Sequence, residues 1–254
     1  MEENRLFPTY FKNAKLEGVI LRRCFFMDKA QHETLLTSLE ESSMLDEYKR
    51  SYDDYPVGII PKILGTILVH CGNLVYGREP SYGKFKSIEV IARIPYQSWE
   101  VASYMLLTMF YADEKKAIEL AKTSEFSRMS QDNETMHVVV LSQLAKKYGE
   151  NGFILHTLLP LLFSFGYATA SFLLYLVSPK SALQLNYLFE DHAFSQYARF
   201  VEHHAGELKE RPVLSDFLAF YGRQAKSEYE LFVSIRNDEI IHRNTSAHRA
   251  DELE

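Results

Sequence analysis

Two Glu-x-x-His units in separate helical segments constrain this chain of 254 residues more than any other feature. They are Glu134-Thr-Met-His137 and Glu239-Ile-Ile-His242. Side chains three residues apart lie on one face of a helix, so both members of a unit can reach the same metal centre. Composition alone would produce about one such match in a chain with nine His. Two matches, each within a strongly helical pattern, therefore indicate a shared metal site.

Four-helix di-iron proteins complete such a site with one lone glutamate from each of two further helices. Glu89 opens the helical segment before the first unit, and Glu190 lies between the two units, each beside apolar residues. A carboxylate among apolar side chains is costly unless it has a partner such as a metal cation. Six such oxygen and imidazole ligands favour iron or manganese over a zinc thiolate site.

The hydrophobic pattern is helical, with spacing of three and four residues from residue 86 onward and little period-two alternation. We predict an all-α fold built on a ferritin-like di-iron four-helix bundle over residues 81–254, with extra membrane-associating helices. Residues 1–80 form an N-terminal extension in this reading, with an interfacial helix within 55–76. The expected helices cover 29–49, 87–112 with a kink or break near Pro95, 113–123, 126–148, 153–177, 181–204 and 214–242, with a turn at 205–212.

Residues 153–177 are almost free of charge and long enough to span a bilayer. His156, Pro160, Gly166 and many small or hydroxyl residues in this segment are more typical of a helix buried within a bundle. Two placements therefore remain open for this helix: burial within the bundle, or contact with lipid.

The formal charge of −6 and the scattering of Lys and Arg among acids argue against a nucleic-acid surface. Cys24 and Cys71 form no CxxC pair or disulfide framework, so we interpret them as buried or idle thiols in a reducing compartment. The first residues, MEENR, lack the features of a signal or transit peptide. We expect that the protein is used where it is made, or else that the sequence begins at a processed or trimmed start.

Tyr197 follows Glu190 by seven residues, on the same helix face and roughly 10 Å further along the axis. It is either an ordinary packed tyrosine or a redox-active phenol beside the metals. Glu100 lies eleven residues after Glu89, about 16 Å along the helix, which is too far to share a metal.

On these residues the chain resembles the alternative oxidase family, and its plastid terminal oxidase branch more than its mitochondrial branch. The resemblance covers about residues 82–248. The matching stretches are 88–96 (IEVIARIPY), 133–137 (NETMH), 176–180 (LVSPK), 190–197 (EDHAFSQY) and 235–242 (IRNDEIIH).

The resemblance implies two iron ions held by Glu89, Glu134, His137, Glu190, Glu239 and His242, with Tyr197 close to them. It also implies that Asn133 and Asp238 orient the ligands. Lys84, Ile88 and Gln196 are expected at a quinol pocket, although the family usually has Arg in place of Lys84 and Thr in place of Gln196. Lys keeps the charge of Arg but loses its bidentate geometry.

The implied activity is oxidation of ubiquinol or plastoquinol with reduction of dioxygen to water, without proton pumping. The implied setting is one leaflet of a membrane, expected at the cytoplasmic face of a bacterial inner membrane, with a homodimer as the assembly. Two other functions remain open from the residues: a soluble di-iron oxygenase or hydroxylase acting on another substrate, and a ferritin-like metal-binding bundle.

Overall fold

The computed structural model describes residues 27–253, which form helices and no β-strand. The first residues MEENR and Cys24 lie outside the described residues. The helices are α2 (Lys29–Ser38), α3 (Ser42–Arg50), α4 (Ile59–Tyr76), α5 (Tyr82–Met109), α6 (Glu114–Lys147), the π-helical turn η1 (Ile154–Leu158), α7 (Leu159–Val177), α8 (Pro179–Glu210), α9 (Asp216–Tyr221) and α10 (Glu228–Asp251).

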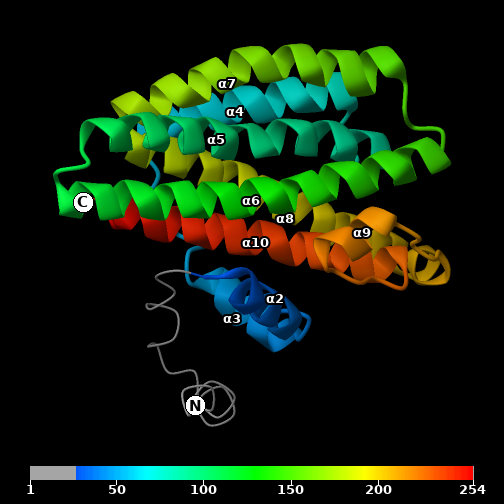
Figure 1. Ribbon diagram of the computed structural model, residues 1–254. Coiled ribbons are helices and arrows are strands. Elements are labelled where there is room, and N and C mark those ends of the chain that lie inside the picture. Colours follow the sequence, from blue (N-terminus) through cyan, green and yellow to red (C-terminus); the bar gives the residue numbers. More distant parts are fainter. Residues whose placement is uncertain (1–26, 254) are drawn as a thin grey trace, which may run out of the picture.

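The four longest bundle helices, α5, α6, α8 and α10, carry all the predicted metal ligands. Their most extensive contacts pair α5 with α6 and α8 with α10, and both pairs run side by side in Figure 1. These helices surround a core of aromatic and aliphatic side chains. The predicted all-α four-helix bundle is confirmed.

Local capping residues fix where the four bundle helices begin. Ser81, Asp113, Ser178 and Ser227 each accept a hydrogen bond from a backbone N–H in the first turn of α5, α6, α8 and α10, respectively. A side-chain oxygen at this position satisfies a donor that the helix itself leaves unpaired. Because the helix starts are fixed, the register of the ligand residues on each inner face is fixed as well.

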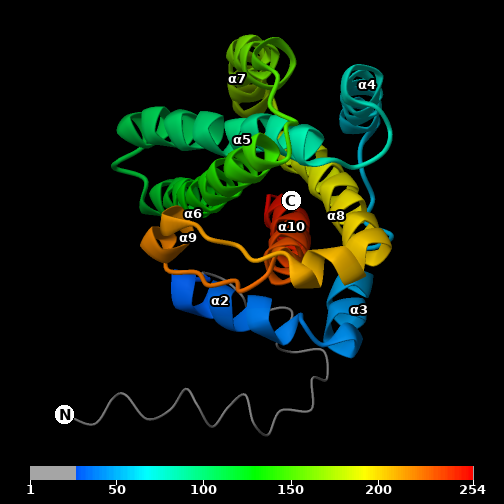
Figure 2. The ribbon, with the colours of Figure 1, turned by 90° about the vertical axis from the view of Figure 1, so that its right-hand side faces the viewer.

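Helices α4 and α7 lie on one side of the bundle, where they stand out above α5 and α8 (Figure 2). Both are long and apolar enough to cross a membrane, and few of their side chains are buried. Ile59 is 70% exposed and Val177 is 84% exposed. Of the two placements left open for residues 153–177, burial within the bundle is excluded, because this helix meets the bundle along only one narrow face.

Helices α2 and α3 lie on the opposite side of the bundle, beneath α10 in both ribbon views. Leu36 and Leu39 are buried against Phe194, Ile240 and Ile241 of α8 and α10. The predicted single helix over 29–49 is instead two helices, since the chain turns after Leu39 to keep this apolar contact.

The structure has no helix break at two places where the sequence analysis allowed one. Helix α5 continues through Pro95, so no break occurs there, and packing against α6 and α7 holds the helix together. The segments 113–123 and 126–148 form the single helix α6, because contact with α5 along its length overrides the weak helix propensity of residues 123–124.

The C-terminal boundaries also differ from the sequence pattern. Helix α8 continues to Glu210, so the turn expected over 205–212 begins later. The segment 214–242 is divided into α9 and α10, because Gly222 takes a left-handed conformation with φ of +91° and ends α9. Helix α10 then continues to Asp251, past the end expected at 242.

Candidate metal centre

All six predicted metal ligands lie together in the middle of the bundle. They form two groups that share Glu134 and Glu239, and the potential ligand atoms within each group lie within 4.8 Å of one another. One group adds Glu89 and His137, and the other adds Glu190 and His242. Every one of these side chains is buried. Two overlapping groups with two shared carboxylates form the arrangement that a pair of metal ions requires.

His137 is oriented by Asp238. Its Nε2 lies 2.9 Å from Asp238 Oδ2, and Arg223 also donates to this carboxylate. These partners hold the pKa of Asp238 well below its usual value, despite the opposing effect of burial. The carboxylate therefore only accepts, so Nε2 carries the hydrogen. A neutral His137 then directs the lone pair of Nδ1 into the site.

The Nδ1 atom of His137 lies 3.4 Å from carboxylate oxygens of Glu89, Glu134 and Glu239. A lone pair among three carboxylates is repelled unless a cation lies between them. In the metal-free chain that cation is a proton. Burial lowers the pKa of His137, but Glu134 and the hydrogen bond to Asp238 overcome this effect and raise it well above its usual value.

The oxygens of Glu134 and Glu239 and both ring nitrogens of His242 are buried and make no hydrogen bond of normal geometry within the described chain, although His242 Nδ1 lies 2.9 Å from Glu134 Oε1. Buried polar atoms are normally satisfied, so a group of unsatisfied atoms facing one another calls for a partner. Four carboxylates and two imidazoles balance the charge of two divalent cations. The residues present thus fit a pair of metal ions.

Burial and mutual repulsion favour the protonated form of three carboxyl groups, those of Glu89, Glu190 and Glu239, when no metal neutralises them. Burial, followed by the charge of Glu134, raises the pKa of Glu89 to about 8. The same two effects raise the pKa of Glu190 and, more strongly, that of Glu239. Burial lowers the pKa of His242 to about 4, which leaves its imidazole neutral and able to bind a metal.

Tyr197 lies directly beside the candidate metal ligands. Its hydroxyl donates a short hydrogen bond to Glu89 Oε1, and the side chain is buried. Burial and the charge of Glu89 raise its pKa well above the usual value, so Tyr197 retains its proton. The proximity expected from the helix spacing is present, through Glu89 on α5 rather than through Glu190 on its own helix.

Two other residues named from the sequence, Asn133 and Glu100, lie outside the two groups of candidate ligands. Asn133 is buried beside Glu134, but its side-chain amide donates to Tyr221 at 3.3 Å and not to a candidate ligand. Glu100 lies outside the group and pairs with Arg128 at 3.6 Å.

Several residues around the site were not predicted. Tyr96 and Asn186 both donate to Glu190 Oε1, at 2.6 and 3.0 Å. His32 of α2 contacts Asp238 at 2.7 Å. Tyr96 lies seven residues after Glu89, so its position on the same helix face could have indicated that it lies near the site. His32 and Arg223 come from segments with no local pattern of their own, and only the packing of the whole chain places them at Asp238.

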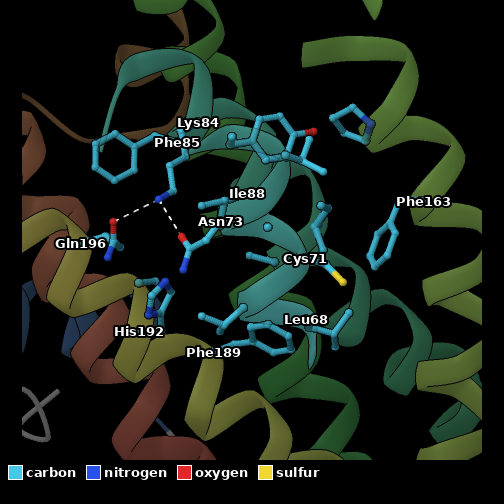
Figure 3. A pocket seen from close by; sticks show the side chains of 18 of the residues that line it. Leu68, Cys71, Asn73, Lys84, Phe85, Ile88, Phe163, Phe189, His192 and Gln196 are labelled. Atoms are coloured by element: carbon cyan, nitrogen blue, oxygen red, sulfur yellow. Dashed lines mark hydrogen bonds between the residues drawn. The ribbon is translucent and has the colours of Figure 1, made fainter. Parts of the chain in front are cut away.

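A pocket lies between α4, α5, α7 and α8, and most of its lining is apolar (Figure 3). Its inner end reaches Glu190 and Tyr197 of the candidate metal centre. Its outer part is bounded by Leu68 and Cys71 of α4 and by Phe163 of α7. Cys71 is an exposed free thiol, so of the two alternatives, a buried or an idle thiol, burial is excluded for this residue. The pocket therefore extends from the exposed apolar helices to the buried carboxylates.

The three residues expected at a substrate pocket, Lys84, Ile88 and Gln196, all line this pocket. Figure 3 shows the Lys84 ammonium directed at Gln196 and Asn73. Its Nζ lies 3.1 Å from Asn73 Oδ1, 3.4 Å from Gln196 Oε1 and 2.8 Å from the carbonyl of Gly77. All three ammonium hydrogens thus have acceptors. Lys84 holds Gln196 and the end of α4 in place at the inner end of the pocket.

Comparison with known proteins agrees with this geometry. Residues 70–251 match the family model described as alternative oxidase. A relative from Arabidopsis thaliana, named "Ubiquinol oxidase 4, chloroplastic/chromoplastic", is 23% identical over 240 residues, which cover 85% of this chain and 65% of the relative. No solved structure matches the chain. The plastid relative agrees with the branch that the motifs indicated. Because the family model covers well over half of the sequence, the chain belongs to the alternative oxidase family.

Proposed function

We propose that the protein is a membrane-associated quinol oxidase that reduces dioxygen to water at a non-haem di-iron centre, without proton pumping. The observation that carries this proposal is the pocket that connects the exposed apolar helices with Glu190 and Tyr197. A substrate dissolved in lipid could enter between α4 and α7 and bring its head group beside the candidate metal centre. A water-soluble substrate would gain nothing from such an entrance.

The six buried ligands would hold the two iron ions, and the iron pair would supply the redox chemistry that reduces dioxygen. Asp238 fixes the orientation of His137, and Asn186 and Tyr96 fix that of Glu190. These fixed orientations mean that little rearrangement is needed when the metals bind.

The inner end of the pocket supports quinol as the substrate. Gln196 presents an amide near Tyr197, and Lys84 fixes its position. Phe85 and Ile88 cover the adjoining walls and exclude water. A quinol ring here would lie next to the Tyr197 hydroxyl, which holds its proton against Glu89. Tyr197 can therefore supply one electron to dioxygen reduction while its proton passes to Glu89, and quinol can restore it.

The apolar surface of α4 and α7 supports attachment to one leaflet of a membrane. Ile60, Ile63 and Ile67 of α4 and Leu162 and Phe165 of α7 are exposed. A helical surface of this kind lies in the interface between lipid and water. Because quinol would enter and quinone would leave on the same side, turnover would move no charge across the membrane. The homodimer and the bacterial inner membrane remain predictions.

Oxygen uptake by the iron-loaded protein in lipid vesicles tests the proposal, with ubiquinol and plastoquinol compared. We expect quinol-dependent oxygen uptake that is lost in Glu190→Ala and retained in Glu100→Ala, a control carboxylate on α5 outside the site. Two bound irons without oxygen uptake on any quinol would favour a soluble oxygenase or hydroxylase. Iron uptake by a protein that needs no lipid or detergent, with no effect of Tyr197→Phe, would favour a ferritin-like bundle.

A further inference from the structure

A second group of phenols lies within the bundle, away from the candidate metal ligands. Glu228, the first residue of α10, is fully buried. Its Oε2 accepts a hydrogen bond of 2.6 Å from Tyr82, and its Oε1 accepts one of 2.6 Å from Tyr148. The two tyrosine rings are stacked, with their centroids 4.6 Å apart. One buried carboxylate thus serves as proton acceptor for two adjacent phenols.

Aromatic rings connect this group with Tyr197 at the metal centre. Phe232 of α10 lies between them, with its ring centroid 6.1 Å from that of Tyr197 and 5.7 Å from that of Tyr82. Phe85 stacks on Tyr197 at 4.1 Å and contacts Phe232 at 5.7 Å. The rings therefore form an unbroken series from Tyr197 to Tyr148, and each ring contacts the next.

The outer end of the series reaches solvent. Tyr148 is half-buried, and the exposed Lys147 forms an ion pair of 3.0 Å with Glu228 Oε1. Arg211 donates to the Tyr82 hydroxyl at 3.0 Å. This donor remains a partner for the Tyr82 oxygen when the phenol has lost its hydrogen. Tyr82 and Tyr148 thus have both a base for their protons and a route to the surface.

We propose that Tyr82, Tyr148 and Glu228 form an escape route that carries an oxidising equivalent from Tyr197 to the protein surface when the pocket lacks quinol. The inference rests on the proposed function, in which Tyr197 gives up one electron and one proton. Quinol bound in the pocket would contact Tyr197 directly and restore it first. The route would therefore operate only when reduced substrate is missing.

The transfer balances in electrons and protons at each step. Tyr82 gives one electron to the Tyr197 radical and its proton to Glu228, while Tyr197 recovers its own proton from Glu89. Tyr148 then gives one electron to the Tyr82 radical, and Glu228 returns a proton from Oε2 to Tyr82. At the same time Tyr148 gives its own proton to Glu228 Oε1. A soluble one-electron reductant such as ascorbate or a thiol supplies the last electron to Tyr148, and Glu228 returns the proton.

Radical trapping tests the route in iron-loaded protein exposed to oxygen without quinol. Tyr82→Phe and Tyr148→Phe are compared with Tyr229→Phe, a control tyrosine next to Glu228 that packs on the same core. Peptide mapping after addition of a nitroso spin trap locates the radical. We expect the Tyr148 peptide to be labelled in the wild type and in Tyr229→Phe. Tyr82→Phe should move the label to the Tyr197 region and make quinol oxidase activity decay several-fold faster over repeated quinol-free oxygen exposures.

The same label distribution and decay rate in Tyr82→Phe and the wild type would overturn the inference. Oxygen uptake with quinol, measured on fresh samples, separates this failure from that of the proposed function. Normal uptake without label at Tyr148 would refute the escape route alone. Label at Tyr148 without uptake on any quinol would refute the proposed function alone.

Discussion

Replacement of Asp238 by Asn should weaken both the fold and the metal site. The Asp238 carboxylate is fully buried and accepts hydrogen bonds from His137, His32 and Arg223. Asn removes the negative charge but hardly changes the volume. Arg223, which is itself buried, would then face an amide in place of a carboxylate, and the two histidines would share one remaining acceptor oxygen.

Breaking a buried ion pair by removing one partner costs about 3–5 kcal/mol. Arg223 keeps its contact with Glu33 at 2.8 Å, so we expect the lower end of this range. In a domain of this size, about 3 kcal/mol corresponds to a fall in melting temperature of roughly 6–12 °C. Loss of an orienting partner of a metal-binding histidine weakens metal affinity by roughly 10–100-fold.

Denaturant unfolding of the metal-free protein measures the stability, and anaerobic Fe(II) titration measures the affinity. Asp191→Asn is a matched control, because Asp191 also pairs with a buried arginine, Arg243. Asp191 is 45% exposed, and Arg243 keeps Asp53 at 3.0 Å, so this control should cost no more than about 1 kcal/mol. Equal losses in the two variants, or unchanged iron affinity in Asp238→Asn, would refute the assigned role of Asp238.

Three further predictions concern the pH dependence of stability, the binding of the protein to vesicles and the binding of quinol in the pocket. Burial raises the pKa of Glu89 from 4.5 to about 8, so between these pH values the folded metal-free protein holds a proton that the unfolded chain releases. The melting temperature of the metal-free protein should therefore fall as the pH rises from 4.5 to about 8. A rise in melting temperature over this range would contradict the raised pKa of Glu89. Ile63→Glu with Ile67→Glu should remove about 2 kcal/mol of vesicle binding, more than tenfold in a flotation assay, whereas Leu214→Glu on the loop before α9 should have no effect. Gln196→Ala should raise the KM for quinol more than it lowers kcat, at unchanged iron content; an unchanged KM would exclude contact with the substrate.

The bundle and the clustering of its six candidate ligands could be predicted because both depend on local periodicity. The two Glu-x-x-His units fix which face of α6 and α10 points inward, and the apolar neighbours of Glu89 and Glu190 do the same for α5 and α8. This information suffices to bring the six side chains together, because the inner faces of four helices packed around one core all point to the same central region.

The remaining features depend on contacts between distant segments. The placement of the 153–177 helix could not be predicted, because a wholly apolar pattern does not distinguish a core helix from one on the outside of the bundle. His32 and Arg223 meet at Asp238 only through tertiary packing. The Lys84 ammonium donates hydrogen bonds to backbone carbonyls just after α4. Every residue has a backbone carbonyl, so the sequence does not indicate which of them will accept these bonds.

Iron stoichiometry per chain tests the central claim most directly. Anaerobically reconstituted wild-type protein and the control Glu100→Ala should each hold two iron ions per chain, with the Mössbauer spectrum of a coupled pair after oxidation. Glu190→Ala should lose iron and the coupled spectrum together. A Glu190→Ala protein that keeps the full iron content and the coupled spectrum would contradict the account.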